Sequence, residues 1–203
     1  MSGVRKALAP ALLALLLLLG ACGGGDDVAV GDLHGSVLDP PFDVAGDELQ
    51  ATDGAAYSLT KDTDKRLTLL FFGYTRCDDV CPAVMANLAS AMTRLSDSDR
   101  KQVDVVFATT DPAYDTPQII RQYVDRYDKS FIGVTGSLEQ LEDVAGSVAA
   151  ALGTKQPDGS YQADAHTTQV TGIDSDDQAP IYWSATTSSA QFAEDIHTLL
   201  GKP

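Results

Sequence analysis

The sequence predicts an α/β fold in which a central mixed sheet is covered by helices on both faces. Residues 67–72, an apolar run with a single threonine, and residues 103–108 have the pattern of strands that are buried on both sides. Each run is followed by a helical segment, as in parallel β-α-β units. Two further apolar segments flank an acidic turn at residues 174–178 and precede a last helix, which indicates an added antiparallel pair.

Three helices between these strands are expected over residues 82–95, 117–127 and 138–153. Thr116 is a capping residue followed by Pro117, and proline suits the first position of a helix. Ser137 and Gln140 form the pattern of a capping box, and Gly153 is a typical residue at a helix end.

The remaining segments complete the prediction. We expect a hairpin within residues 37–60 around Asp53 and Gly54 and a short extended segment at 131–134. An exposed loop is expected at 154–165, followed by strands near 167–173 and 180–184. A last amphipathic helix should place Phe192, Ile196, Leu199 and Leu200 on one side. This order suits a thioredoxin-like three-layer sandwich with an N-terminal hairpin. In that fold a cysteine pair follows an early strand at the start of the next helix.

The N-terminus has the pattern of a secretory signal peptide over residues 1–21. Arg5 and Lys6 precede an apolar run at 7–19, which is shorter than the roughly 20 residues of a membrane-spanning helix. The ending at Cys22 resembles a bacterial lipobox, in which the cysteine carries a diacylglycerol. The alternative is an ordinary signal peptide followed by an incidental thiol. We expect lipidation of Cys22, a flexible tether over 22–37 and a domain over 38–203.

The formal net charge of −15 argues against nucleic-acid binding. An acidic surface repels phosphate backbones and anionic lipid headgroups. The charge is consistent with solubility outside the cell, and it indicates no specific partner.

With Cys22 assigned to a lipid, Cys77 and Cys81 are the remaining thiols. Because Pro82 favours a helix that begins there, we expect Cys81 at the N-terminal cap and Cys77 on the preceding turn. The helix dipole and its unpaired N–H groups favour thiolates, which serve both disulfide exchange and soft-metal binding. Three intervening residues favour a metal pair, while a redox pair and a structural disulfide stay open.

A third ligand would have to be one of three histidines. His34 lies near the tether and His197 in the last helix, where a structural or surface role is expected. His166 opens the predicted strand that follows the exposed loop. In a thioredoxin-like sheet, that strand end can approach the cysteine loop.

These residues resemble the Sco/SenC family of copper-binding, thioredoxin-like proteins. The matching pieces are Phe72-Gly73-Tyr74-Thr75, Cys77-Asp78-Asp79-Val80-Cys81-Pro82, Asp111-Pro112 with Asp115-Thr116-Pro117, Phe131-Ile132-Gly133-Val134-Thr135-Gly136, and His166-Thr167. The resemblance covers residues 38–201. It implies that Cys77, Cys81 and His166 bind one copper ion, as Cu(I) or Cu(II).

Three positions depart from the family pattern. Asp78 stands where proline is usual, and Tyr114 stands where arginine is common. An acidic residue often directly precedes the histidine, but here Ala165 does, and Asp164 is one position further back. In a strand that shift turns the carboxylate to the opposite face. If Asp164 cannot orient the imidazole of His166, we expect another group to hold the ring in place.

The resemblance implies a lipid-anchored copper chaperone at the extracytoplasmic face of the cytoplasmic membrane, with the copper-site subunit of a haem-copper respiratory oxidase as its client. The alternative is a thiol-disulfide reductase that keeps the client's cysteines reduced and is itself recycled by a thiol reductant. In such a reductase Cys77 attacks the client's disulfide, and Cys81 resolves the mixed disulfide. The lack of a proline near His166 disfavours a general oxidoreductase, and Arg76 alone does not support a peroxidase.

Overall fold

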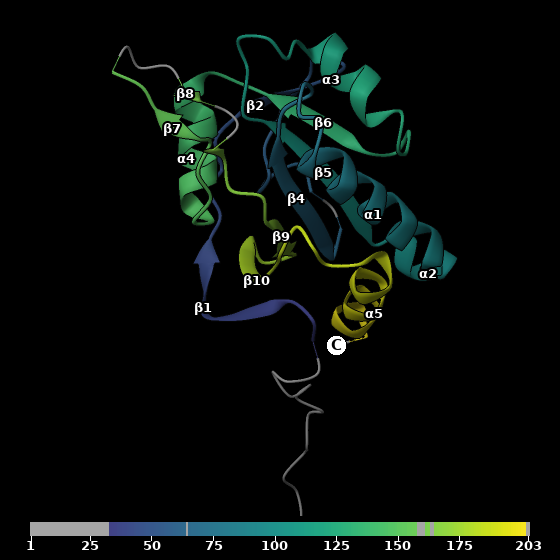
Figure 1. Ribbon diagram of the computed structural model, residues 1–203. Coiled ribbons are helices and arrows are strands. Elements are labelled where there is room, and N and C mark those ends of the chain that lie inside the picture. Colours follow the sequence, from purple (N-terminus) through teal and green to yellow (C-terminus); the bar gives the residue numbers. More distant parts are fainter. Residues whose placement is uncertain (1–32, 64, 158–160, 163–164, 202–203) are drawn as a thin grey trace, which may run out of the picture.

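The structure, a computed structural model, describes residues 33–63, 65–157, 161–162 and 165–201 (Figure 1). An eight-stranded mixed sheet has the order β1-β10-β9-β4-β5-β6-β2-β3. The longer strands are β1 (Ser36–Asp43), β4 (Leu67–Gly73), β5 (Val103–Thr109), β6 (Ile132–Thr135), β9 (Val170–Asp174) and β10 (Gln178–Trp183). The predicted thioredoxin-like α/β fold is confirmed.

The sheet is parallel at its centre and antiparallel on both flanks, where β2 pairs with β6 on one side and β9 pairs with β4 on the other. β4 pairs in parallel with β5, and β5 with β6, while β9 and β10 add antiparallel strands on the other side of β4. Every residue of β4 is buried. β4 is therefore a core strand covered on both faces, as its apolar run with a single threonine predicts.

Helices cover both faces of the sheet (Figure 1). α1 (Val80–Arg94), α3 (Pro117–Val124) and α5 (Ser189–Leu200) pack in one core with Leu69 and Phe71, whereas α4 (Leu138–Ser147) packs with Leu70 and Phe72 in the other. Successive side chains of a strand point to opposite faces, which explains this division. A short helix, α2 (Asp97–Arg100), follows α1 and was not predicted.

The predicted hairpin is confirmed as β2 (Leu49–Ala51) and β3 (Ala56–Tyr57), and β2 joins the sheet beside β6. Its turn contains Gly54 with a φ of 89°, a conformation that glycine adopts without strain.

At the N-terminal end of the described chain, β1 begins at Ser36 and pairs with β10, so the last residues assigned to the tether belong to the sheet. The signal segment 1–21, Cys22 and tether residues up to 32 lie outside the described residues. Among the helices that are described, none is long and apolar enough to span a membrane.

The predicted start of α1 was wrong. The helix begins at Val80, so Cys81 is its second residue and not the cap, and Pro82 is the third. Proline is tolerated there because the first amides of a helix have no partner within the helix.

The predicted end of α4 at Gly153 was also wrong. Ala149 adopts a φ of 53°, and the N–H of Ala150 donates to the carbonyl of Ala145 over 2.8 Å. This left-handed turn ends the helix near Ser147, with alanine at the position that glycine usually takes.

The segment after α4 also differs from the prediction. The expected loop at 154–165 contains a two-stranded ribbon of β7 (Thr154–Lys155) and β8 (Tyr161–Gln162). β9 begins at Val170 and not near Thr167, because the backbone of Thr167 pairs with Ala151 instead of the sheet.

Candidate metal centre

The two thiols lie where the chain leaves β4 and enters α1. The N-cap residue Asp79 makes no side-chain capping hydrogen bond. Instead, the backbone N–H of Cys81 donates to Sγ of Cys77 over 3.3 Å. The sulfur of Cys77 thus takes the place of a capping oxygen at the positive end of the helix.

The surroundings of the two thiols separate their pKa values. Burial raises the pKa of Cys77, but hydrogen bonds from the Cys81 thiol and from the N–H groups of Cys81, Asp79 and Val80 outweigh it, so this pKa is lowered. Burial, followed by the hydrogen bond with Cys77, raises the pKa of Cys81. Cys77 is half-buried and Cys81 fully buried, and neither is in a disulfide. Cys77 is therefore the thiol that ionises first.

His166 lies beside the buried thiol. Its Nε2 is 3.7 Å from Sγ of Cys81, and its Nδ1 is 2.8 Å from the carbonyl oxygen of Thr167. A carbonyl only accepts, so the neutral ring carries its proton on Nδ1 and has its lone pair on Nε2. The ring of Tyr74 packs edge-on against the imidazole, with centroids 5.7 Å apart. The orientation of the ring places the lone pair of Nε2 beside Sγ of Cys81.

A loop, and not the predicted strand, positions His166. The N–H of Thr167 donates to the carbonyl of Ala151 over 2.9 Å, and the N–H of Ala151 donates to Oγ1 of Thr167 over 2.9 Å. These bonds fix the loop against the segment that follows α4. Asp164 lies outside the described residues, and within them the carbonyl of Thr167 accepts a hydrogen bond from the imidazole.

The distance between Cys81 and His166 suits a shared metal ion. With bond lengths of about 2.3 Å to sulfur and about 2.0 Å to nitrogen, as for zinc, one ion holds the two atoms about 3.5–3.8 Å apart. The observed 3.7 Å lies in this range. Within the described residues, no three Cys, His, Asp or Glu side chains already surround a common metal position.

The end of β4 allows Cys81 to lie against the sheet because residue 73 is glycine. A Cβ at Gly73 would meet Sγ of Cys81 at 3.1 Å and the rings of Phe71 and Phe107 at 3.0 Å. Such distances are shorter than almost all real contacts of a Cβ atom. A side chain here would displace the thiol or the aromatic core.

Asp115 joins the cysteine loop to the start of α3. Its carboxylate is 1% exposed and accepts the N–H of Thr75 at 3.0 Å, the hydroxyl of Thr75 at 2.5 Å and the hydroxyl of Thr109 at 2.7 Å. Buried carboxylates are tolerated when such donors surround them. The contact fixes Thr75, two residues before Cys77, to the neighbouring loop.

Sequence reasoning missed two parts of this arrangement, the carboxylate of Asp115 and the carbonyl of Thr167. Asp115 lay within a motif that matched the family, but the match assigned it no role. The carbonyl of Thr167 cannot be recognised from the sequence, because every residue has a backbone carbonyl. His34 and His197 lie outside the site, where their rings contact the carboxylates of Glu194 and Asp99 at 2.9 Å.

Comparisons with known proteins place these observations in a family. The SCO1/SenC family model matches residues 41–201. The mitochondrial SCO1 homolog 1 of Arabidopsis thaliana is 34% identical over 125 residues, which cover 57% of this chain and 37% of that protein. The mitochondrial SCO2 homolog of Bos taurus is 30% identical over 131 residues, covering 63% and 49%. The matches thus span between a third and a half of these relatives.

Solved structures agree with the family match along most of their length. The apo Sco1 protein of Thermus thermophilus is 27% identical, with a TM-score of 0.69, covering 82% of this chain and 96% of that one. Bradyrhizobium japonicum ScoI with copper bound is 25% identical, with a TM-score of 0.62, covering 78% and 97%. The chain therefore belongs to the SCO1/SenC family.

Proposed function

We propose that this chain is a copper-binding metallochaperone that delivers copper to the dinuclear copper site of a haem-copper respiratory oxidase. The observation that carries the proposal is the 3.7 Å approach of His166 Nε2 to Cys81 Sγ, with the other ring nitrogen bound to a carbonyl. The similar ScoI of Bradyrhizobium japonicum has copper bound, and the Sco family comprises cytochrome c oxidase assembly proteins.

The donor set fits copper in either oxidation state. Two thiolates are soft ligands that favour Cu(I), and an imidazole suits Cu(II) as well. Cys77, Cys81 and His166 would hold the ion together. The lowered pKa of Cys77 favours its thiolate, while a bound metal would displace the proton of the Cys81 thiol into solvent.

Delivery proceeds by exchange of ligands and needs no oxidation or reduction. Cys77 is half-buried, so a thiolate of the client displaces it first. Cys81 is fully buried and pairs with His166, so these two ligands retain the ion until the client supplies a second ligand.

The N-terminal pattern supports anchoring of the protein to the outer face of the cytoplasmic membrane through lipid on Cys22. We expect labelled palmitate to enter the full-length protein in cells and to be absent from a Cys22→Ser variant. Labelling of this variant at the level of the wild type would contradict the assignment.

The copper function is tested by titrating the reduced full-length protein with Cu(I) in competition with a chromophoric chelator. We expect one ion per chain and at least a tenfold loss of affinity in each of Cys77→Ser, Cys81→Ser and His166→Ala, since one bound ligand is worth more than about 1.4 kcal/mol. His197→Ala, which removes a surface histidine, should bind as the wild type does. Wild-type affinity in all three site variants would refute the proposal.

One observation favours a second function, that of a thiol-disulfide reductase. The accessible thiol has the lowered pKa and the buried thiol the raised one, which suits attack by Cys77 and resolution by Cys81. Cys77 would displace one client sulfur, and Cys81 would then release the client as a dithiol, leaving a Cys77–Cys81 disulfide for an external thiol reductant. Reduction of an oxidised client by a protein that binds no copper would favour this function.

A further inference from the structure

An exposed aromatic side chain is held in a defined position near Cys77. Tyr114 is 45% exposed, and within the part of the chain that the structure describes it is the one large hydrophobic side chain that is so exposed. The guanidinium carbon of Arg76 lies 4.0 Å from the centre of its ring. Arg76 also donates to the carboxylate of Asp111 over 2.5 Å. The tyrosine is thus stacked under a guanidinium that is itself held in an ion pair.

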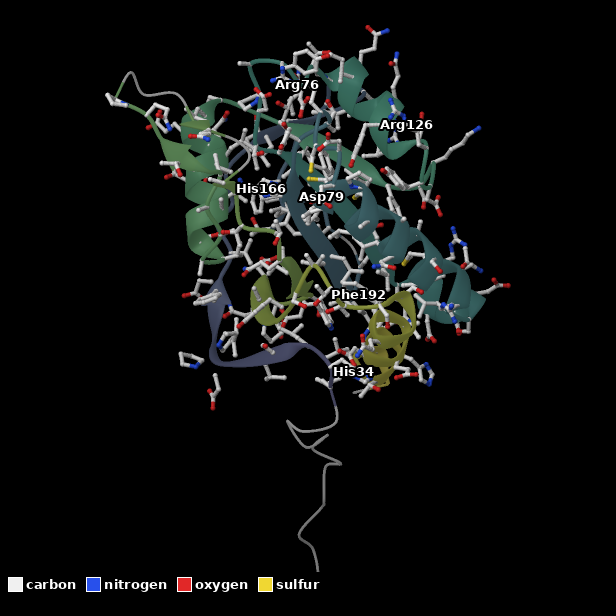
Figure 2. The ribbon with its side chains drawn as sticks, viewed as in Figure 1. His34, Arg76, Asp79, Arg126, His166 and Phe192 are labelled. Atoms are coloured by element: carbon white, nitrogen blue, oxygen red, sulfur yellow. The ribbon has the colours of Figure 1, made fainter. Side chains whose placement is uncertain are left out.

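This arrangement lies at the rim of the candidate metal centre. Arg76 directly precedes Cys77, and Tyr114 lies in the loop between β5 and α3 that Asp115 joins to the cysteine loop. Figure 2 shows Arg76 at the end of the molecule opposite His34, which marks the N-terminal end of the described chain. Arg76 and the Tyr114 ring beside it therefore lie next to the loop that carries Cys77, at the end of the molecule away from His34.

We propose that Tyr114 and Arg76 form the docking contact for the protein that accepts copper from Cys77, an inference that rests on the proposed function. Ligand exchange requires the thiols of the acceptor to come within bonding distance of an ion held by Cys77. The acceptor must then cover the surface around this residue. Tyrosine and arginine are the residue types that most often dominate binding energy at protein interfaces.

The charges around the thiol define the kind of partner. Asp78 and Asp79 are exposed beside Cys77, while the positive charge of Arg76 is paired with Asp111. An acidic partner face would bring like charges together, so an uncharged or basic face fits this surface. Because the stacked ring is already ordered, little side-chain freedom is lost when a partner covers it.

The proposal is tested with full-length protein in detergent and the soluble copper-site domain of the oxidase subunit from the same organism. Three quantities are measured: association of the copper-free proteins by biolayer interferometry, the rate of Cu(I) transfer to the domain, and the rate of Cu(I) transfer to bathocuproine disulfonate. For Tyr114→Ala we expect association and transfer to the domain to fall at least tenfold. The rate to the small chelator should not change, because the chelator needs no docking surface.

Two further variants sharpen the test. Tyr114→Phe keeps the ring under Arg76 and should transfer copper at nearly the wild-type rate. Arg94→Ala is the control for Arg76→Ala, because Arg94 is also an exposed arginine but lies in the last turn of α1, at the opposite end of that helix from Cys81. Arg76→Ala should weaken association, and Arg94→Ala should leave it unchanged.

The proposal is overturned if Tyr114→Ala associates with the domain as the wild type does. It is also overturned if copper transfer to the chelator slows as much as transfer to the domain, because the effect would then lie in the metal site. A different result is expected if the proposed copper function is wrong. If the wild type binds no Cu(I) and Tyr114→Ala still weakens association, the docking surface stands and the copper function does not.

Discussion

At the scale of single residues, Cys77 and Cys81 differ more than their short separation suggests. Cys77 is half-buried and accepts the N–H that a capping oxygen usually takes, whereas Cys81 is fully buried against Gly73 and His166. One thiol is therefore ready to react or exchange, and the other is placed to retain a ligand.

This difference predicts the order of alkylation. The pKa of Cys77 lies below the ordinary value of 9.0 and that of Cys81 above it, so the thiolate of Cys77 forms at lower pH. At pH 7 we expect iodoacetamide to modify Cys77 while Cys81 stays unmodified, as measured by mass spectrometry of peptides from the reduced protein. Cys77→Ser should react slowly until the protein is unfolded. Faster modification of Cys81 would contradict the assigned roles.

At the scale of elements, Asp115 connects β4, β5 and α3 at the edge of the sheet where the cysteine loop begins. Its partner Thr109 is the last residue of β5, and its partner Thr75 follows the end of β4 by two residues. The cysteine loop is therefore held by its neighbouring elements as well as by α1.

Asp115→Ala should leave three donors without an acceptor. We expect the free energy of unfolding to fall by about 3 kcal/mol, since hydrogen bonds to a buried charge contribute about 1.5–3 kcal/mol each in mutational series and are not additive. Chemical denaturation measures this loss. Asp125→Ala, which removes an exposed carboxylate paired with Arg121, is the control and should cost under about 1 kcal/mol. Equal losses in the two variants would show that Asp115 has no special role.

The elements were predictable where local sequence determines them. The mainly apolar runs predicted β4 and β5, and the capping residues Thr116 and Ser137 predicted the starts of α3 and α4. The end of α4 was missed because Ala149 adopts a left-handed conformation that nothing in its local sequence indicates.

The site was predictable only in part, since its members are distant in the chain. Cys77 and Cys81 are visible as a pair in the sequence, and family resemblance added His166. The sequence placed His166 on a strand, because the bonds that hold its loop connect Thr167 to Ala151, 16 residues away. The link from Thr75 to Asp115 spans 40 residues and follows from no local pattern.

At the scale of the whole molecule, a second buried carboxylate fastens the N-terminal end of the described chain to the domain. Asp195 of α5 is 1% exposed and accepts the N–H groups of His34 and Gly35 and the indole N–H of Trp183. Figure 2 shows His34 beside α5, away from His166. The point where the chain enters the domain is thus fixed at a distance from the candidate metal centre.

Asp195→Ala should separate stability from copper binding. We expect the free energy of unfolding to fall by about 3 kcal/mol, because three donors lose their acceptor. Fluorescence of Trp183, the single tryptophan, reports the transition. The Cu(I) affinity of the folded variant should match that of the wild type. Glu194→Gln, at an exposed neighbouring position, is the control for stability. A parallel loss of copper affinity in Asp195→Ala would show that the two ends of the molecule are coupled.

The central claim is that Cys77, Cys81 and His166 bind one copper ion together. X-ray absorption at the copper edge of the Cu(I)-loaded full-length protein tests it most directly. We predict scattering from two sulfur atoms and one nitrogen atom, with the nitrogen contribution lost in His166→Ala and one sulfur lost in Cys77→Ser. A spectrum without sulfur neighbours, or a nitrogen contribution that persists unchanged in His166→Ala, would contradict the account.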